Sequence, residues 1–260
     1  MSVPQGLRFA PSREVPPTLI LIPTYNEAAN LEPLVASLRE HAADADILVV
    51  DDASPDGTGD IADRLAADSA VHVLHRPGKE GLGVAYRAGF SWGLQRPEYK
   101  WFVEMDADGS HRPAELRRLR NAAYVADLVI GSRWVRGGRV LDWPWARRLI
   151  SKAGTAYARL LLRLPVHDAT AGYRVLSRRA LEAASLDTVA SHGYCFQIDM
   201  TRRIHDAGLQ ILEVPVTFAE RQHGASKMTS GIVAEALWRV TLWGIAGWFR
   251  RNSTRRFRRA

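Results

Sequence analysis

The sequence predicts an α/β fold built on a mainly parallel sheet, and three observations support this. From residue 18 onward, apolar runs alternate with amphipathic stretches. The apolar runs contain few polar residues, which is typical of strands that helices cover on both faces. The most polar segments follow directly after these runs, and ligands of such sheets bind beyond the carboxyl ends of the strands. We therefore expect polar side chains from several strand ends to line one edge of the sheet.

The first half of the chain carries most of this pattern. Asn30 is a plausible N-cap, and Pro113 suits the first position of a helix. The strands expected here span residues 18–23, 46–50, 71–74, 100–105 and 128–130, and the helices between them span residues 31–41, 58–67, 83–94 and 113–124.

The second half is more helical. We expect helices at residues 145–162 and 194–207, a strand at 209–218 and a final apolar segment at 232–249. No internal repeat or interdomain linker is evident. The predicted organisation is a disordered leader (1–17), one α/β domain (18–227) and a C-terminal helix with a basic tail (228–260).

Composition and charge narrow the class of protein. The chain has 260 residues, of which 47% are hydrophobic, enough for one large buried core. Its one cysteine, Cys195, excludes an intrachain disulfide and suits a reducing compartment. Residues 1–17 lack the apolar region of a signal peptide. The net charge of +7 lies mainly in residues 250–260, which carry arginines and no acid, so the basic balance describes a tail more than a fold.

The final apolar segment is too short and too charged for a transmembrane span, which needs roughly twenty apolar residues. It contains Glu235 and Arg239, and tryptophans flank its apolar face. The residues at helical spacing are Trp238, Leu242, Ile245 and Phe249, with Trp243 and Trp248 beside them. Two readings are open: a helix in a membrane interface held by the arginine tail on anionic lipid, or a helix packed on the protein's own core before a solvated or RNA-binding tail. We favour the interface and expect no nucleic-acid partner.

The stretch VEMDADGSH (103–111) places two carboxylates after an apolar run. On a strand, Asp106 and Asp108 would point the same way and repel each other. An Asp-Gly turn would explain them without function. A divalent cation would remove the repulsion, because Mg²⁺ is held by one or two carboxylates and completes its shell with water and phosphate. Asp108 is then the safer metal ligand, Asp106 could bind metal or a ribose, and Ser110 could add a hydroxyl.

Other polar residues at the strand ends have both a structural and a functional interpretation. The Asp51–Asp52 pair and Glu27 could cap turns or helices, or could accept hydrogen bonds from a nucleoside. Arginine and lysine at such ends are commonly solvated, yet guanidinium groups suit phosphate. The candidates are Arg133, Arg147, Arg148, Arg221 and Lys227.

Several kinds of chemistry are excluded. Tyr86 stands where a dinucleotide fingerprint needs its third glycine, and no P-loop is present. We reject a thiol nucleophile at Cys195 beside His192, because no third orienting group is evident. No Cys/His spacing indicates zinc.

Taken together, nine motifs resemble polyprenol-phosphate mannose synthases, the dolichol-phosphate-mannose-synthase-like branch of family 2 glycosyltransferases. They occur in order over about residues 18–227. The motifs are LIPTYNE (21–27), VVDDASPDGT (49–58), GLGVAYRAG (81–89), MDADGSH (105–111), GSR (131–133), DATAGYR (168–174), GYCFQID (193–199), EVPVTFAER (213–221) and GASK (224–227).

The resemblance implies a GT-A fold and inverting transfer of mannose from GDP-mannose to a polyprenyl monophosphate, with Mg²⁺ or Mn²⁺ as cofactor. It also implies peripheral attachment to the cytoplasmic face of the membrane, and a membrane-protein partner is compatible with it. Donor positions carried over are Pro23, Tyr25, Glu27, Val50, Asp52, Asp106, Ala107, Asp108, Arg221 and Lys227. The positions carried over for the acceptor phosphate are Arg133 and Arg147, with Arg148 beside them. Those carried over for the metal are Asp106, Asp108 and Ser110. Relatives can have Gln where Ser110 stands. Because Ser is a weaker ligand, Ser110 is the least certain of the three metal ligands.

Two alternatives remain at this stage. The same chemistry could use another nucleotide sugar such as UDP-glucose. Alternatively, the chain could be a non-enzymatic binding protein with structural acidic loops. The mannosyltransferase interpretation gives the catalytic roles to Asp108, Arg133 and Arg147, because an anionic acceptor must approach an anionic sugar-diphosphate. At about 4 Å and an effective dielectric near 20, each unit pair repels by roughly 4 kcal/mol.

Overall fold

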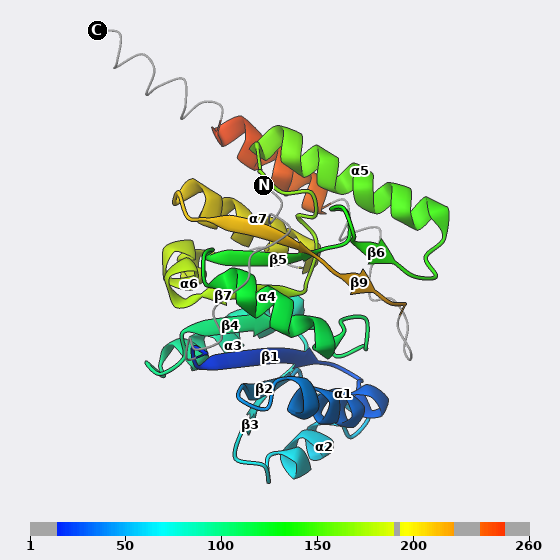
Figure 1. Cartoon of the computed structure of the whole chain (residues 1–260), viewed down its shortest axis with the longest axis vertical. Coiled ribbons are helices and arrows are strands. Elements are labelled where there is room, and N and C mark those ends of the chain that lie inside the picture. The colour runs from blue at the N-terminus through cyan, green and yellow to red at the C-terminus, as the bar shows by residue number, and fades with distance from the viewer. Residues whose placement is uncertain (1–14, 190–192, 221–234, 248–260) are drawn as a thin grey trace, which may run out of the picture.

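The protein is built around a seven-stranded sheet with helices on both faces (Figure 1). The computed structural model describes residues 15–189, 193–220 and 235–247. The strand order is β3-β2-β1-β4-β7-β5-β8, and β7 alone of these strands runs antiparallel to its two neighbours. The predicted mainly parallel α/β architecture is therefore confirmed.

All five strands predicted in the first half are present. The main sheet comprises β1 (Thr18–Thr24), β2 (Asp46–Asp51), β3 (Val71–His75), β4 (Trp101–Glu104), β5 (Leu128–Ser132), β7 (Arg174–Ser177) and β8 (Ile211–Pro215). A second sheet pairs β6 (Arg139–Val140) with β9 (Thr217–Phe218). The single strand expected at 209–218 was wrong in one respect: it divides at Val216, so that β8 pairs with β5 and β9 with β6.

The helices also follow the predicted pattern. They are α1 (Ala28–His41), α2 (Thr58–Leu65), α3 (Leu82–Leu94), the 3₁₀ turn η1 (Pro113–Glu115), α4 (Leu116–Ala123), α5 (Trp145–Leu162), α6 (Arg178–Ala184), the 3₁₀ turn η2 (Leu186–Thr188) and α7 (Gly193–Asp206). Residues 235–247 form a further helix that lies along α5 (Figure 1).

The start of α1 differs from the prediction. The helix begins at Ala28, and its N-cap is Glu27 rather than Asn30. The backbone N–H groups of Asn30 and Leu31 donate to the Glu27 carbonyl, and the Asn30 side chain donates to Glu27 Oε2 at 2.7 Å. Asn30 therefore holds the Glu27 carboxylate from inside the first turn of the helix.

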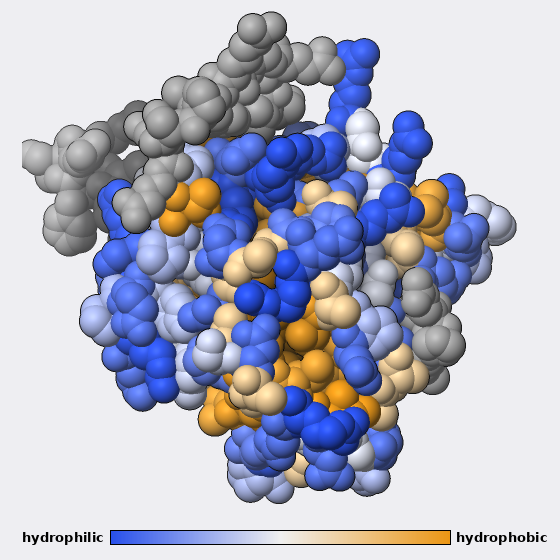
Figure 2. Space-filling view, turned by 60° about the horizontal axis from the view of Figure 1, so that its bottom comes forward, coloured by the Kyte–Doolittle hydropathy of each residue, from blue (hydrophilic) through white to orange (hydrophobic). Residues whose placement is uncertain are grey.

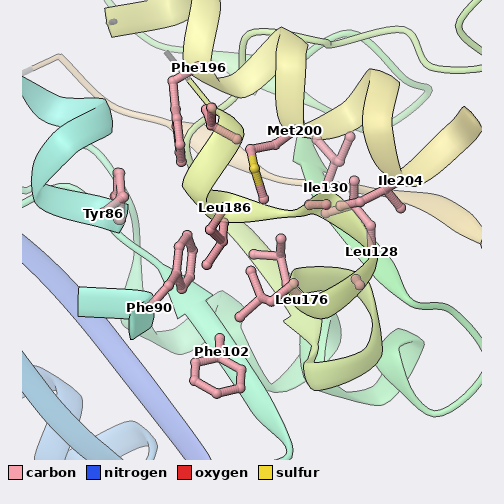
Figure 3. Packing of buried hydrophobic residues seen from close by; sticks show 14 of the residues in the cluster. Tyr86, Phe90, Phe102, Leu128, Ile130, Leu176, Leu186, Phe196, Met200 and Ile204 are labelled. Atoms are coloured by element: carbon pink, nitrogen blue, oxygen red, sulfur yellow. The ribbon is translucent and has the colours of Figure 1, made fainter. Parts of the chain in front are cut away.

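Two apolar layers flank the sheet, as the alternation of strand side chains requires. In β1, Leu19 and Leu21 face one layer, while Ile20 and Ile22 face the other. Figure 3 shows part of the first layer, in which Tyr86 and Phe90 of α3 lie near Phe196 of α7. The two aromatic pairs that Tyr86 forms with these residues are both stacked, with ring centroids 6.0 Å apart.

The outer surface contrasts with these layers. The face seen in Figure 2 is mostly hydrophilic, and its hydrophobic residues gather toward the centre of the view. Within the described part of the chain, no helix has the length and apolar character that crossing a bilayer demands.

Helix α3 approaches the sheet closely through two glycines. A Cβ placed on Gly89 would lie 2.5 Å from Leu21 Cδ2. A Cβ placed on Gly93 would lie 2.6 Å from Phe102 Cε1 and 2.7 Å from Leu19 Cδ2. These neighbours are fully buried, so they have little room to move. The glycines thus allow the helix to pack directly on β1 and β4.

We expect Gly93→Ala to lower the free energy of unfolding by about 1–3 kcal/mol, because the overpacking cost exceeds the gain of about 1 kcal/mol in helix propensity. Urea denaturation measures this. Gly154→Ala in α5 is the matched control, since its Cβ would meet nothing within 4 Å. If both variants were equally stabilised, close packing of α3 would not be a constraint on this fold.

Candidate active site

The carboxyl ends of β1 and β2 form the first part of the site. Pro23 and Thr24 of β1 lie opposite Val50 and Asp51 of β2 in the parallel register. The Asp51 carboxylate accepts hydrogen bonds from Thr24 Oγ1 at 2.9 Å and from Ser54 Oγ at 2.5 Å. Of the two adjacent aspartates, Asp51 is therefore the one that holds the turn together.

Asp52 has a different partner. Its buried carboxylate forms an ion pair with Arg76, which also contacts Glu80. Burial raises the pKa of Asp52, although Arg76 acts in the opposite direction. Sequence reasoning missed Arg76, because a single arginine after β3 carries no signal by itself. The partner makes Asp52 a carboxylate held in a fixed orientation at the end of β2.

The segment after β1 lies at the same edge. The Tyr25 ring lies under Lys79, whose Nζ is 3.9 Å from the ring centroid. The Glu27 backbone N–H donates to Thr58 Oγ1 at 3.0 Å. The structure thus brings the predicted nucleoside-side residues to the ends of two neighbouring strands.

The argument from strand alternation for Asp106 and Asp108 was wrong, because β4 ends at Glu104. The two aspartates instead lie on a turn that passes through Gly109, whose φ of 74° is in the left-handed region. Asp108 is 4% exposed, and its Oδ1 accepts from the Ser110 N–H at 3.1 Å. The Asp106 N–H donates to His111 Nδ1 at 3.1 Å.

The turn still brings both carboxylates together around His111. Burial lowers the pKa of His111, while the charges of Asp106 and Asp108 act to raise it. Burial raises the pKa of the Tyr86 hydroxyl, and the same two charges act in the same direction. Ala107, between the aspartates, is buried. Asp106 and Asp108 therefore share one electrostatic environment at this turn, although neither of them lies on β4.

The oxygen atoms at this turn suit a hard divalent cation. Ser110 is fully buried, and its Oγ has no hydrogen-bond partner in the described part of the chain. Residues 15–189, 193–220 and 235–247 contain no cluster of three or more His, Cys, Asp or Glu side chains with metal-binding geometry. Asp106, Asp108 and Ser110 could offer a cation two carboxylates and a hydroxyl, which would fit a metal that takes few protein ligands and completes its shell with water and phosphate.

On the other side of the site, Arg133 follows β5 and is held rigidly. Its Nε and Nη2 donate to the two Asp168 oxygens, both at 2.7 Å, and Nη2 also donates to Thr170 Oγ1 at 2.9 Å. Asp168 is fully buried, and its backbone N–H donates to Glu213 Oε1 of β8 at 2.9 Å. A buried network of charges thus fixes the guanidinium at the end of β5.

The loop that carries Asp168 also reaches the carboxylate turn. A Cβ placed on Gly172 would lie 3.5 Å from Asp106 Oδ2 and 3.5 Å from His111 Cε1. Sequence reasoning missed the role of Asp168, although the motif that contains it was noted. The available signal was an acid and a glycine at the two ends of the short segment DATAG (168–172).

Arg147 lies at the start of α5 and is less buried. Its Nη1 donates to Glu220 Oε1 at 3.1 Å, and its guanidinium lies 4.0 Å from the centroid of the Trp143 ring. The Arg133 guanidinium is 5.5 Å from the same ring. Trp143 therefore lies close to both arginines.

Both arginines line one cavity of about 370 Å³ between α5 and the helix of residues 235–247. Apart from a few polar groups, its walls are apolar. The lining residues are Arg133, Trp143, Pro144, Ala146, Arg147, Ile150, Ser151, Gly154, Tyr157, Thr170, Ile198, Ala236, Leu237 and Val240. We call this the apolar cavity.

Arg148 lines a different cavity, of about 420 Å³, on the β6 side of α5. Its Nη2 donates to the Val140 carbonyl at 3.1 Å. The structure therefore separates Arg148 from Arg147, with which the sequence grouped it. Arg221 and Lys227, the predicted diphosphate ligands, lie outside the described residues.

Cys195 has no part in this site. The thiol is buried, and burial raises its pKa to about 12, so it stays protonated near neutral pH.

Comparison with known proteins supports the family resemblance. The family model described as Glycosyl transferase family 2 matches residues 19–184. An undecaprenyl-phosphate mannosyltransferase of Micrococcus luteus is 56% identical over 229 residues, which cover 88% of this chain and 94% of that protein. A polyprenol monophosphomannose synthase of Mycolicibacterium smegmatis is 52% identical over 256 residues, which cover 95% and 96% of the two chains.

Solved structures show the same fold at lower identity. Glucosyl-3-phosphoglycerate synthase from Mycobacterium tuberculosis, in complex with Mn²⁺, UDP and glucosyl-3-phosphoglycerate, has a TM-score of 0.61 and 20% identity, covering 86% of this chain and 77% of that one. The mannosyltransferase PcManGT from Pyrobaculum calidifontis, in complex with GDP-Man and Mn²⁺, has a TM-score of 0.56 and 18% identity, covering 91% and 65%.

These likenesses establish the GT-A fold and contradict the alternative of a non-enzymatic binding protein. The chain belongs to glycosyl transferase family 2, in its branch of polyprenol-phosphate mannose synthases.

Proposed function

We propose that this enzyme transfers mannose from GDP-mannose to a polyprenyl monophosphate, with inversion at the sugar, giving polyprenyl-phosphate mannose and GDP. The main support is the apolar cavity. Its apolar walls suit a prenyl chain, and Arg133 and Arg147 suit the phosphate at the end of that chain. The names of the two relatives, which refer to undecaprenyl phosphate and polyprenol, support this acceptor class.

The donor would bind along the carboxylate edge of the sheet. Its nucleoside would lie against Tyr25, Glu27 and Asp52, beside the strand-end residues Pro23 and Val50, and its diphosphate near Asp106, Ala107 and Asp108. The solved structure of PcManGT, which holds GDP-Man and Mn²⁺ on this fold, supports a guanine nucleotide donor. Arg221 and Lys227, which lie outside the described residues, stay predicted ligands of the diphosphate.

Mg²⁺ or Mn²⁺ would be held by Asp108, with Asp106 and the Ser110 hydroxyl as further ligands. When bound, the cation would neutralise the negative charge that develops on the leaving diphosphate. The buried Ser110 Oγ, which has no hydrogen-bond partner in the described part of the chain, supports this third ligand, although a hydroxyl is a weaker ligand than a carboxylate.

The reaction places little demand on acid–base chemistry. The acceptor phosphate is already an anion near neutral pH, so it can attack the sugar without a strong general base. The main cost is repulsion between acceptor phosphate and donor diphosphate. Arg133 and Arg147 would offset it on the attacking side, and the rigid Asp168 contact fixes Arg133 before substrate binds.

Membrane attachment would present the lipid to the apolar cavity. One face of the helix of residues 235–247 packs on the protein: Thr241 contacts Tyr157 of α5, and Trp243 lies by Arg202 of α7. Its other face is exposed. Packing on the protein is therefore present along one side of this helix, and its place in a membrane interface stays a prediction. Together with α5 it displays the exposed apolar side chains Trp145, Leu149, Ile150, Leu160, Leu237, Trp238, Leu242 and Ile245.

We propose that this apolar surface lies in the interface of the cytoplasmic membrane leaflet. The arginine tail at 250–260, together with Trp248 and Phe249, lies outside the described residues, and its contact with anionic lipid stays a prediction. A separate membrane-protein partner also stays a prediction, as does the absence of a nucleic-acid partner.

A donor and acceptor panel tests the function directly. With Mg²⁺ or Mn²⁺, we expect purified enzyme to convert GDP-mannose and a polyprenyl phosphate to a lipid-linked mannose, and a chelator to stop the reaction. Radiolabelled product extracted into organic solvent measures it. Turnover of UDP-glucose but not GDP-mannose would assign the enzyme to the alternative donor.

Asp108→Asn should reduce the transfer rate by at least about 100-fold, because it removes the charge that would hold the cation. The exposed Asp187→Asn is the matched control and should keep full activity. Circular dichroism must show native folding for both variants. A folded Asp108→Asn protein with normal activity would exclude Asp108 as the metal ligand.

Arg147→Ala should lower kcat/KM for polyprenyl phosphate by about 10- to 100-fold, since it removes a charge-assisted contact worth about 1.5–3 kcal/mol. GDP binding, measured by calorimetry, should be unchanged. Arg133→Ala is a poorer test, because it would leave buried Asp168 unpaired and destabilise the fold. An equal loss of GDP binding in Arg147→Ala would place Arg147 on the donor side instead.

A further inference from the structure

The second cavity, which contains Arg148, has a strongly basic lining. Four of its residues are cationic and none is acidic. The lining residues are Arg133, Trp134, Val135, Gly138, Arg139, Val140, Leu141, Arg148 and Lys152, around a volume of about 420 Å³. We call this the basic cavity. A cavity with this charge favours an anion of small size.

Arg133, which follows β5, is paired with Asp168, and the other three cations come from β6 and α5. Arg139 belongs to β6, while Arg148 and Lys152 stand one turn apart on α5 and so share a side of the helix. Arg148 is tied to the Val140 carbonyl, and Lys152 Nζ lies 5.0 Å from the centroid of the Trp134 ring. These contacts hold the two side chains of α5 at the wall of the cavity, where Arg139, Arg148 and Lys152 are all exposed and open to a ligand from solvent or from a membrane surface.

The place of the basic cavity on α5 indicates the source of the anion. The neighbouring positions Trp145 and Leu149 on the same helix are 78% and 59% exposed. They belong to the apolar surface that we assign to the membrane interface. Basic side chains beside such a surface lie at the depth of lipid headgroups, where each Lys or Arg adds about 1 kcal/mol of attraction to an anionic leaflet.

We propose that the basic cavity binds the phosphate of an anionic phospholipid headgroup, beside the acceptor site, with Arg133 in the wall between the two. The guanidinium of Arg139 and the ammonium of Lys152 would contact the phosphodiester oxygens from opposite sides, with Arg148 between them. Such a lipid would fix the orientation of α5 on the membrane, and with it the direction in which the apolar cavity opens. This inference rests on the membrane attachment in the proposed function.

The test compares binding of the full chain to two kinds of vesicle, phosphatidylcholine alone and phosphatidylcholine with about 30 mol% phosphatidylglycerol, by co-sedimentation at constant ionic strength. The variant is the double substitution Arg139→Gln, Lys152→Gln. The matched control is Arg117→Gln, Arg179→Gln, which removes the same charge from exposed positions on α4 and α6. Both proteins keep the arginine tail.

We expect the cavity variant to bind phosphatidylglycerol vesicles about 10- to 30-fold more weakly than the wild type, and phosphatidylcholine vesicles equally well. The control pair should lose less than about threefold. Equal losses of vesicle binding in the two variants would overturn the proposal, because the net charge of the protein, and not the cavity, would then explain the binding.

Two further arms identify the anion. Inorganic phosphate at about 10 mM, matched in ionic strength with chloride, should leave the preference for phosphatidylglycerol intact. If it abolished the preference, the cavity would be a site for free phosphate.

In detergent without phosphatidylglycerol, the cavity variant should keep the wild-type KM for polyprenyl phosphate, and a raised KM would assign the cavity to the acceptor instead. Failure of mannosyl transfer in the wild type would contradict the proposed function without changing the vesicle result.

Discussion

The buried ion pair between Arg133 and Asp168 is the contact on which the geometry of the site depends. It joins the end of β5 to the loop before β7, and the bond from Asp168 to Glu213 extends it to β8. Removing either partner would leave an uncompensated buried charge, at a cost of about 3–5 kcal/mol. A pair of this kind adds little net stability, but it determines where the guanidinium lies. Here that position is the wall shared by the apolar and basic cavities.

The site combines negative and positive charge near His111. Burial lowers the pKa of His111 and Arg133 acts in the same direction, whereas the charges of Asp106 and Asp108 act to raise it. A sugar-diphosphate with its cation and a lipid phosphate could meet here with their charges offset by fixed groups, which is the condition for electrostatic preorganisation.

Much of the fold could be predicted from the sequence, because apolar strands and the polar segments after them leave clear local patterns. The edge that gathers Glu27, Asp52 and Asp108 followed from that pattern alone. The antiparallel strand β7 could not be predicted, since it has only four residues, of which the first is Arg174 and only two are apolar. Arg174 is fully buried, and its guanidinium donates to the carbonyls of Ala169 and Gln197. The Gln197 carbonyl belongs to α7, which is distant in sequence, and such a partner leaves no local signal.

The same limit explains which site residues were missed. Asp168 and Arg76 are informative only through Arg133 and Asp52, from which they are distant in sequence. The strand end at Glu104 was also misplaced. Burial raises the pKa of Glu104 to about 7 despite nearby Arg174, which identifies it as a group of the interior rather than of the open edge. The family resemblance placed the candidate residues, whereas the structure showed which of them share a cavity.

The most direct test of this account is a crystal structure with Mn²⁺, GDP-mannose and a short-chain isoprenyl phosphate, with anomalous scattering used to locate the metal. The account predicts a Mn²⁺ peak at the Asp108 carboxylate, about 2.0–2.2 Å from its oxygen, and the lipid phosphate between Arg133 and Arg147. A metal peak away from Asp108, or a lipid phosphate outside the apolar cavity, would contradict it.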